Sequence, residues 1–221
     1  KSIYALPMKG LRRGWKKSIQ GLLTGISPNH RKKQEAVAYS LATIWKSKNH
    51  GKSFFDSSTL FDGYVWTFWN NGIAFDQFDE KRFICFNNDV GMTITLNGGK
   101  HFSLRGIPRK WLTKGKINWT GMYAGAILPE QKSKIILASV GSYFKNKLIR
   151  STNLGKTWNI VDNEYMATLF IGFNKHSKGI VYAGKKISHN NGKLFKHIPT
   201  LQKYNADIVA MCYSNNNIVY A

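Results

Sequence analysis

An acid and a phenol stand side by side at Glu164 and Tyr165, and such a pair is chemically capable of acid–base or nucleophilic work. Their spacing argues against that role. Successive residues of a strand point to opposite faces, so neighbours in the chain do not converge on one substrate. The sequence therefore predicts an exposed acid beside a packed aromatic side chain.

The spacing of the histidines and cysteines fits neither a metal site nor a redox-active cysteine pair. His50, His101 and His189 lie in three similar turns, but at differing offsets from the glycine of each turn, and no Cys or acid recurs with them. Cys85 and Cys212 are far apart and form no C-x-x-C pair, so we expect two plain buried thiols. The sequence has no phosphate-binding glycine loop or nucleophile motif. We expect no metal and no cofactor.

Basic residues dominate the charge of the chain. The 221 residues include 33 Lys and Arg against 11 Asp and Glu, which gives a formal net charge of +22. A charge of this size attracts polyanions. We expect a polyanionic partner, whether a nucleic acid, an acidic glycan or an acidic neighbouring subunit, and its binding should weaken as salt rises. Two stretches carry the excess without any acid, residues 1–34 and residues 90–129.

A long connection in the second of these stretches, residues 103–119, mixes cations with tryptophan. This composition suits contact with phosphate backbones or stacking on bases or sugars. The alternative is a solvated loop that its two tryptophans, Trp111 and Trp119, tie down. The candidate polyanion-binding residues are Arg105, Arg109, Lys110, Trp111, Lys114 and Lys116.

The elements that must position these residues are marked by a turn that occurs four times. Its pattern is Ser or Thr, then Asn two residues later, Gly two residues after that, and an aromatic residue three further on. Self-similarity of this kind indicates a repeat architecture. The four turns consist of Ser47, Asn49, Gly51 and Phe54; Thr95, Asn97, Gly99 and Phe102; Ser151, Asn153, Gly155 and Trp158; and Ser188, Asn190, Gly192 and Phe195.

The residue types of the turn predict a structural role. Asn, Ser and Thr side chains hydrogen-bond to the nearby backbone, and Gly supplies a positive φ that other residues resist. The aromatic residue has a large apolar body to bury between neighbouring units. These residues are therefore expected to hold the shape of a hairpin.

Short strands flank every turn in the same order. Four-stranded units at a period of about 45 residues are typical of propeller blades, which pack radially so that each covers its neighbour. We predict an all-β fold, a single partial β-propeller over residues 1–221 that belongs to a larger ring and holds about four and a half blades. A pair of separate sandwiches is the alternative. The expected blades cover residues 15–55, 64–104, 121–161 and 167–198, with an incomplete fifth at 206–221 and a basic segment at 1–14.

Within the second expected blade, the first strand is predicted at residues 65–69. Helical periodicity is not sustained anywhere. No window approaches 18 apolar residues, so we expect no membrane span.

The four turns resemble Asp-box, or BNR, repeats, whose family pattern is Ser/Thr-x-Asp-x-Gly-x-Thr-Trp/Phe. All four match at the hydroxyl, Gly and aromatic positions, and the resemblance covers about residues 15–221. The four turns differ from the family pattern in having Asn where the family usually has Asp. The Asn side chain keeps an acceptor oxygen of the same reach but lacks the negative charge. In that family the boxes are structural turns between the third and fourth strands, remote from active sites. They occur in sialidases, xyloglucanase-like glycosidases, sorting receptors, photosystem assembly factors and phage or secreted proteins, so they select no single function.

The resemblance also implies one catalytic candidate. Asp89, in the segment Asn-Asp-Val-Gly, is similar to the Asp-Val-Gly-Gly segment of xyloglucanase-like propellers in which one catalytic Asp resides, although Met92 replaces the second Gly. Glycoside hydrolysis ordinarily requires two carboxylates roughly 5 to 10 Å apart. Asp62 and Asp76 are possible partners, and neither is distinguished by its surroundings in the sequence. The N-terminal Arg-Ile-Pro mark of sialidases is not recognisable.

The sequence favours a non-catalytic propeller that acts as a structural or binding module of a larger assembly, with other subunits as partners. Family analogy points to a phage tail or other virion component, or to an extracellular setting. The first alternative is a glycoside hydrolase of the sialidase or xyloglucanase kind. The second is a basic scaffold that binds nucleic acid or another polyanion.

Overall fold

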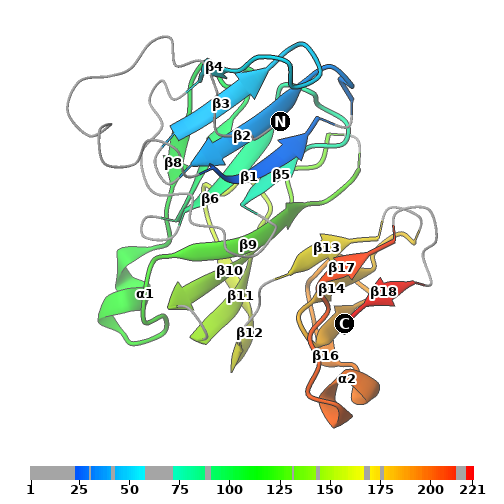
Figure 1. Ribbon diagram of the computed structural model, residues 1–221. Coiled ribbons are helices and arrows are strands. Elements are labelled where there is room, and N and C mark those ends of the chain that lie inside the picture. Colours follow the sequence, from blue (N-terminus) through cyan, green and yellow to red (C-terminus); the bar gives the residue numbers. More distant parts are fainter. Residues whose placement is uncertain are drawn as a thin grey trace.

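The computed structural model describes residues 23–29, 31–40, 43–57, 72–87, 91–130, 132–142, 145–166, 170–174, 177–212 and 218–221. Over these residues the chain forms five antiparallel sheets and two five-residue helices (Figure 1). Four sheets have four strands, each paired with the next strand along the chain, and the fifth sheet has two. The predicted all-β fold built from four-stranded units is confirmed.

The strands follow the chain in order through the sheets. The first sheet contains β1 (Leu23–Pro28), β2 (Ala36–Ser40), β3 (Thr43–Ser47) and β4 (Phe55–Asp56). The second contains β5 (Ile73–Phe75), β6 (Phe83–Asn87), β7 (Gly91–Thr95) and β8 (Ser103–Arg105). The third contains β9 (Met122–Ile127), β10 (Ile136–Ser142), β11 (Lys145–Ser151) and β12 (Asn159–Met166). The fourth contains β13 (Ile171–Phe173), β14 (Val181–Ala183), β15 (Lys186–Ser188) and β16 (Lys196–His197), and the fifth contains β17 (Ala210–Met211) and β18 (Val219–Tyr220).

The sheets pack side by side in chain order. The first strand of the third sheet, β9, contacts β5 and β6 of the second sheet and β13 of the fourth. Each sheet is therefore covered by its neighbours, as propeller blades are (Figure 1). This serial arrangement differs from the pair of separate sandwiches considered as the alternative.

One expected strand lies outside the described residues, and two helices differ from the sequence-based expectations. The second sheet begins with β5 at Ile73–Phe75, whereas residues 65–69, where its first strand was expected, lie outside the described residues. Helices α1 (Arg109–Thr113) and α2 (Pro199–Lys203) occupy connections where no helix was expected. A proline precedes or begins each helix, and its fixed φ suits that position. Five residues are too few to produce a visible helical period.

The four repeated turns share one hydrogen-bond pattern between the third and fourth strands of each sheet. In chain order, the N–H of the box Gly donates to the Ser or Thr hydroxyl oxygen at 2.9, 2.9, 2.8 and 3.0 Å. The Asn Oδ1 accepts the N–H four residues later at 2.9, 3.0, 2.8 and 2.9 Å. All four glycines have a positive φ. The side chains of the repeat therefore fix the turn geometry themselves.

The box glycines of the third and fourth sheets also touch the preceding sheet. A Cβ on Gly155 would lie 2.2 Å from Met92 Cε, and a Cβ on Gly192 would lie 2.3 Å from Leu137 Cδ1. Such distances are far shorter than van der Waals contact, so a side chain at either position would require the Met92 or Leu137 side chain to move. Glycine is required here by the close approach as well as by its φ.

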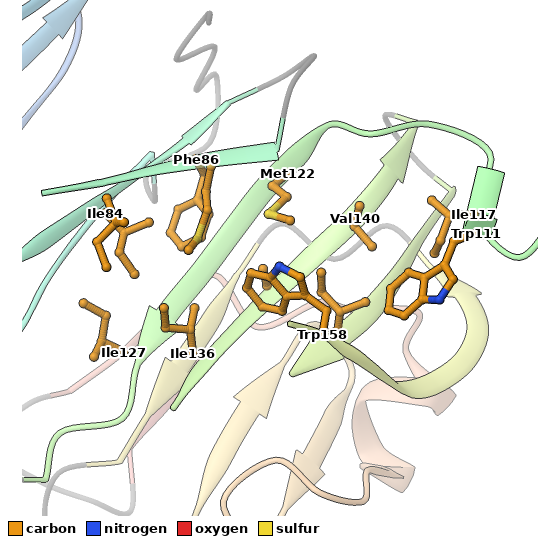
Figure 2. Close-up of a cluster of buried hydrophobic side chains, with 13 residues drawn as sticks. Ile84, Phe86, Trp111, Ile117, Met122, Ile127, Ile136, Val140 and Trp158 are labelled. Carbon is orange, nitrogen blue, oxygen red and sulfur yellow. The ribbon is translucent and has the colours of Figure 1, made fainter. Parts of the chain in front are cut away.

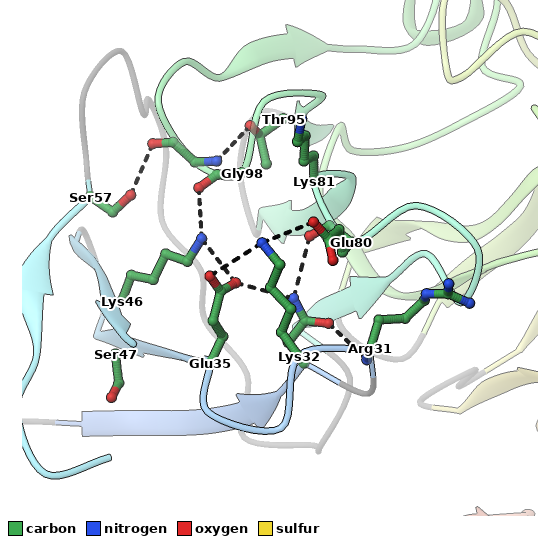
Figure 3. Close-up of polar contacts among 12 residues, drawn as sticks. Arg31, Lys32, Glu35, Lys46, Ser47, Ser57, Glu80, Lys81, Thr95 and Gly98 are labelled. Carbon is green, nitrogen blue, oxygen red and sulfur yellow. Dashed lines mark hydrogen bonds and ion pairs between the residues drawn. The ribbon is translucent and has the colours of Figure 1, made fainter. Parts of the chain in front are cut away.

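A polar network joins the first and second sheets (Figure 3). Lys46, the residue before the first box, donates from Nζ to the carbonyl oxygen of Gly98 in the second box at 3.1 Å and pairs with Glu35 at 3.2 Å. Lys32 lies 2.9 Å from Glu80 and 3.7 Å from Glu35. The hydrogen bond between Lys32 and Glu80 lowers the pKa of Glu80 and raises the pKa of Lys32. Val37 and Ile44 of the first sheet also pack with Phe83 of the second in a buried apolar cluster, so this junction combines ion pairs with apolar contact.

The junction between the second and third sheets is formed around a larger apolar cluster. Phe86 and Met92 from the second sheet pack in one buried cluster with Met122 and Trp158 from the third (Figure 2). The junction between the third and fourth sheets combines an apolar cluster with contacts made by the cations Arg150 and Lys186. Arg150, the residue before the third box, donates from Nε to the carbonyl oxygen of Asn191 in the fourth box at 2.9 Å.

Candidate functional site

The predicted binding segment, residues 103–119, connects the second sheet to the third and contains α1. Trp111 anchors it: its carbonyl oxygen accepts the N–H of Lys116 at 2.8 Å and that of Ile117 at 3.2 Å. The Trp111 side chain is 8% exposed and belongs to the apolar cluster of Figure 2. Trp119, by contrast, is 48% exposed. Trp111 therefore tethers the segment to the core, and its ring is not open for stacking on a base.

Cations line the exposed side of the same segment. Arg109, Lys110 and Lys114 are exposed and form no ion pair with any residue that the structure describes. Lys116 is also exposed, and Arg105 is half-buried and donates from Nη1 to the Leu104 carbonyl oxygen at 3.0 Å. The segment contains no acid. Its positive charge is therefore presented to solvent without a carboxylate of its own to offset it.

An open pocket of about 470 Å³, here called the box-three pocket, lies between this segment and the third box. It brings one of the exposed lysines of the segment, Lys110, to the same cavity as Lys156 of the box, which is also exposed. The pocket is lined by Gly106, Ile107, Pro108, Lys110, Trp111, Lys156, Thr157, Trp158 and Asn159.

Two buried donors at this junction have no acceptor within the protein. The Trp158 side chain is 4% exposed, and its Nε1 makes no hydrogen bond. The Nε of Arg105 is likewise buried without a partner, and a Cβ on Gly155 of the same box would lie only 3.3 Å from Arg105 Cβ. A buried donor left without an acceptor costs about 1–3 kcal/mol. The junction therefore holds two donors that are closed off from solvent and lack an acceptor in the protein.

Most of the described acids are neutralised inside the protein. Glu35 and Glu80 pair with lysines at the first junction, and the Asp76 Oδ2 accepts from Arg82 Nε at 2.5 Å. The carboxylates that form ion pairs are those of Glu35, Asp76, Glu80, Asp162 and Glu164. These pairs take up about as many cations as acids, so the excess positive charge of the chain remains on the other lysines and arginines.

The structure describes one of the three carboxylates considered for glycoside hydrolysis, Asp76. Asp89 and Asp62 lie outside the described residues. Asp76 is buried, accepts the N–H of Phe78 and of Asp79, and is held by Arg82. The Asp76 carboxylate is therefore engaged in contacts within the protein.

Glu164 is also engaged. Its carboxylate lies 2.5 Å from Lys186 Nζ and 3.0 Å from His197 Nε2, and Lys186 contacts Asp162 at 2.5 Å as well. The hydrogen bonds from Lys186 and then His197 lower the pKa of Glu164. A lowered pKa is the opposite of what a general acid requires. Tyr165 lies in β12, and its side chain lies outside the described part of the structure.

The remaining candidates for chemistry are scattered. His50, His101 and His189 are exposed, and the described residues contain no group of three His, Cys, Asp or Glu side chains that could hold a metal ion. Cys85 is buried, and burial raises the pKa of its thiol, whereas Cys212 is half-buried. Within the described ranges, no helix has the length and apolar character needed to cross a membrane.

No family model matches the chain, and no curated protein matches its sequence. An ancestral GH74 enzyme aligns with a TM-score of 0.59 and 18% identity over 80% of this chain and 24% of that structure. The GH74 xyloglucanase from Xanthomonas campestris aligns with a TM-score of 0.53 and 13% identity, over 80% of this chain and 30% of that one. The fold is a β-propeller. The extracellular domain of a hybrid two-component system from B. thetaiotaomicron aligns with a TM-score of 0.58 and 11% identity, over 89% of this chain and 27% of that one.

These alignments show that the chain shares a fold with the three structures. At 11% to 18% sequence identity they do not show a shared function. The chain spans only 24% to 30% of the length of these structures. The propeller has no closed ring within the described residues, as expected for part of a larger one.

Sequence reasoning missed the contribution of the third box to the pocket. Lys156, Thr157 and Asn159 were interpreted only as part of a structural turn, and nothing in their spacing shows that they face the segment at 103–119. It also missed the cations that link one box to the next. The sequence does contain a signal for these linking cations, because Lys46 and Arg150 directly precede the Ser that begins each of their boxes.

Proposed function

We propose that this propeller is a non-catalytic module that binds a polyanionic partner through the segment at residues 103–119. The observation that carries the proposal is the row of exposed cations, Arg109, Lys110 and Lys114, which have no ion-pair partner in the described structure. Lysine and arginine on a tethered segment bind phosphate or sulfate groups by charge and release counterions.

The charge distribution of the rest of the molecule supports the same role. Internal carboxylates are held by internal cations, so they do not compete for the partner at the surface. The unpaired charge is left to attract a polyanion over the range of the Debye length, about 8 Å at physiological ionic strength.

The test compares the wild-type chain with a triple variant, Arg109→Glu, Lys110→Glu and Lys114→Glu, on immobilised heparin and on labelled oligonucleotides at several salt concentrations. The variant should bind at least about 10-fold more weakly at about 0.1 M salt, and the slope of log affinity against log salt on duplex DNA should fall by about 3. The matched control is Lys178→Glu, Lys193→Glu and Lys196→Glu, which makes the same charge change at exposed lysines of the fourth sheet. The proposal is wrong if the wild type is not retained at low salt, or if both variants lose equal affinity.

The module is proposed to work within a larger assembly, and a phage tail or other virion is the assembly that the family analogy favours. That placement rests on the Asp-box resemblance alone. Glycoside hydrolysis is not the proposed function, because the two described candidates for catalysis, Asp76 and Glu164, are held by cations. Hydrolysis of a glycan panel by the wild type, lost in Asp89→Asn, would reverse this choice.

A further inference from the structure

We propose that Trp119 is a base-stacking residue and that the polyanion bound by residues 103–119 is a single-stranded nucleic acid. The inference rests on the proposed polyanion-binding function and names the class of polyanion. Its elements are the exposed indole of Trp119, the contacts that fix the backbone on both sides of this residue, and the cations of the same segment.

Trp119 differs in exposure from the other tryptophans that the structure describes. The side chains of Trp45, Trp111 and Trp158 are 7%, 8% and 4% exposed, as is usual for a side chain that is highly buried on average. Trp119 is 48% exposed. Nearly half of a large apolar ring system therefore remains in water, where a flat ligand can cover it with a gain in free energy.

The backbone that carries this indole is fixed on both sides. Ile117 is 1% exposed and belongs to the apolar cluster of Figure 2. Asn118 Nδ2 donates to Ser142 Oγ at 2.8 Å, and Asn118 Oδ1 accepts the Ser142 N–H at 3.3 Å. After Trp119, the Gly121 carbonyl oxygen accepts the N–H of Gly141 at 3.0 Å. The indole is thus held in place before a ligand arrives, which lowers the entropy cost of binding.

Cations lie in the same short stretch of chain. Lys114 and Lys116 are exposed, and the N–H of Lys116 donates to the Trp111 carbonyl oxygen at 2.8 Å, so its backbone is fixed as well. The Cα atoms of Lys116 and Trp119 are separated by three peptide units and are therefore no more than about 11 Å apart. An ammonium and an indole at this separation can contact a phosphate and a base of one short strand. Proteins bind single strands through this combination of positive charge and an aromatic face.

The exposed ring separates single strands from duplexes. In a duplex the bases are paired and stacked on one another, so their faces are not free to lie on an indole. A duplex can therefore use the cations of the segment but not Trp119, whereas an unpaired strand can use both. We expect Trp119 to contribute to the binding of unpaired strands only.

The composition of the segment disfavours a sulfated glycan. The hydroxyl groups of a sugar ring need polar side chains that fix its orientation, and amides and carboxylates are common among them. Residues 103–119 contain no Asp, Glu or Gln and a single Asn, Asn118. Its amide is engaged with Ser142 at both its nitrogen and its oxygen. The segment therefore offers charge and an aromatic face, which suit phosphates and bases better than sugar hydroxyl groups.

The test measures binding to the full chain at about 0.1 M salt. The nucleic-acid probes are labelled oligo-dT and oligo-U of about 12 nucleotides, within the range of single-strand site sizes, and a DNA duplex of the same length, all read by fluorescence anisotropy. Immobilised heparin is the fourth probe. Trp119→Ala should weaken the binding of at least one single strand by about 5-fold or more, the effect of losing one stacked base. Its binding to the duplex and to heparin should change by less than about 2-fold.

Two further variants separate stacking from general apolar contact. Trp119→Phe keeps an aromatic face, so its affinity for the single strand should stay within about 3-fold of the wild type. The matched control is Leu104→Ala, which removes an apolar side chain of the same segment that is 46% exposed but has no aromatic face. Its affinity for all four probes should change by less than about 2-fold.

A second readout does not depend on affinity or on the stability of the alanine variant. A base stacked on an indole quenches its fluorescence, so saturating unlabelled oligo-dT or oligo-U should quench the intrinsic tryptophan emission of the wild type. The quench should be largely absent in Trp119→Phe. A quench that persists in Trp119→Phe, or equal losses of single-strand affinity in Trp119→Ala and Leu104→Ala, would overturn the inference.

This inference and the proposed function fail in different ways. If heparin and the duplex are bound but Trp119→Ala leaves single-strand affinity unchanged, or weakens all four probes equally, the stacking role is wrong and the polyanion-binding function stands. If no probe is bound at low salt, the broader function is wrong, and the inference that rests on it is wrong too.

Discussion

At the scale of single residues, one hydroxyl oxygen does most to shape each box turn. In the third box, Ser151 Oγ accepts the N–H of Gly155 at 2.8 Å and that of Asn153 at 3.2 Å, and it lies 3.0 Å from Asn153 Oδ1. Asn replaces the usual Asp without loss because the turn uses its Oδ1 as an acceptor. The amide adds something that a carboxylate lacks, since Asn153 Nδ2 donates to Thr157 Oγ1 at 2.8 Å.

Ser151→Ala tests this account. Ser151 is 1% exposed, so its loss leaves buried N–H groups without an acceptor. The free energy of unfolding, measured with urea, should fall by about 1–3 kcal/mol. Thr152→Ala is the matched control, because Thr152 is the neighbouring hydroxyl residue and is exposed in the same turn, and its effect should stay within about 0.5 kcal/mol. Equal urea midpoints for the two variants would contradict the role given to the Ser151 hydroxyl.

At the scale of elements, the junctions between sheets differ in chemistry although the boxes are alike. The first junction adds ion pairs to an apolar cluster, the second is apolar, and the third adds the Arg150 hydrogen bond to an apolar cluster. Between β12 and the fourth sheet lies a further charged cluster, in which Asp162 and Glu164 share Lys186. Lys186 is 4% exposed, so its charge depends on these two carboxylates.

This cluster predicts how stability depends on pH. Lys186 and His197 lower the pKa of Glu164 below its ordinary value of 4.5. The folded state therefore binds the ionised form better, and the resulting stabilisation is present above about pH 4.5 and is lost as pH falls through the lowered pKa. Glu164→Gln should reduce the free energy of unfolding at pH 7 by no more than about 1 kcal/mol, since the side chain is largely exposed.

The measurement is urea unfolding of wild type and Glu164→Gln between pH 2.5 and 7. The difference between them should shrink toward zero at the acid end. Asp79→Asn is the control, because Asp79 is an exposed acid without an ion pair in the described structure, and its difference should stay small throughout. A Glu164→Gln effect that is constant with pH would show that the contact with Lys186 is not the source of the stability.

At the scale of the whole molecule, the repeat made the architecture predictable. A box of four residue types recurs with flanking strands, so the local turn chemistry and the global packing point to the same fold. What the sequence did not show depends on contacts between distant segments. The burial of Trp111, the meeting of Lys156 with residues 103–119, and the pairing of Lys46 with the next box are each set by tertiary packing that no local pattern encodes.

The net charge of +22 predicts an unusual response to salt. Self-repulsion among surface cations destabilises the compact state, and it is screened when the Debye length falls from about 30 Å at 0.01 M salt to about 8 Å at 0.15 M. The internal ion pairs respond less, because Lys46 and Glu35 have side chains that are only 10% and 9% exposed. Repulsion should therefore dominate, and the melting temperature should rise by a few degrees over this range. Circular dichroism in NaCl at fixed pH measures it, and a melting temperature that falls with salt would mean that the ion pairs contribute more than the repulsion removes.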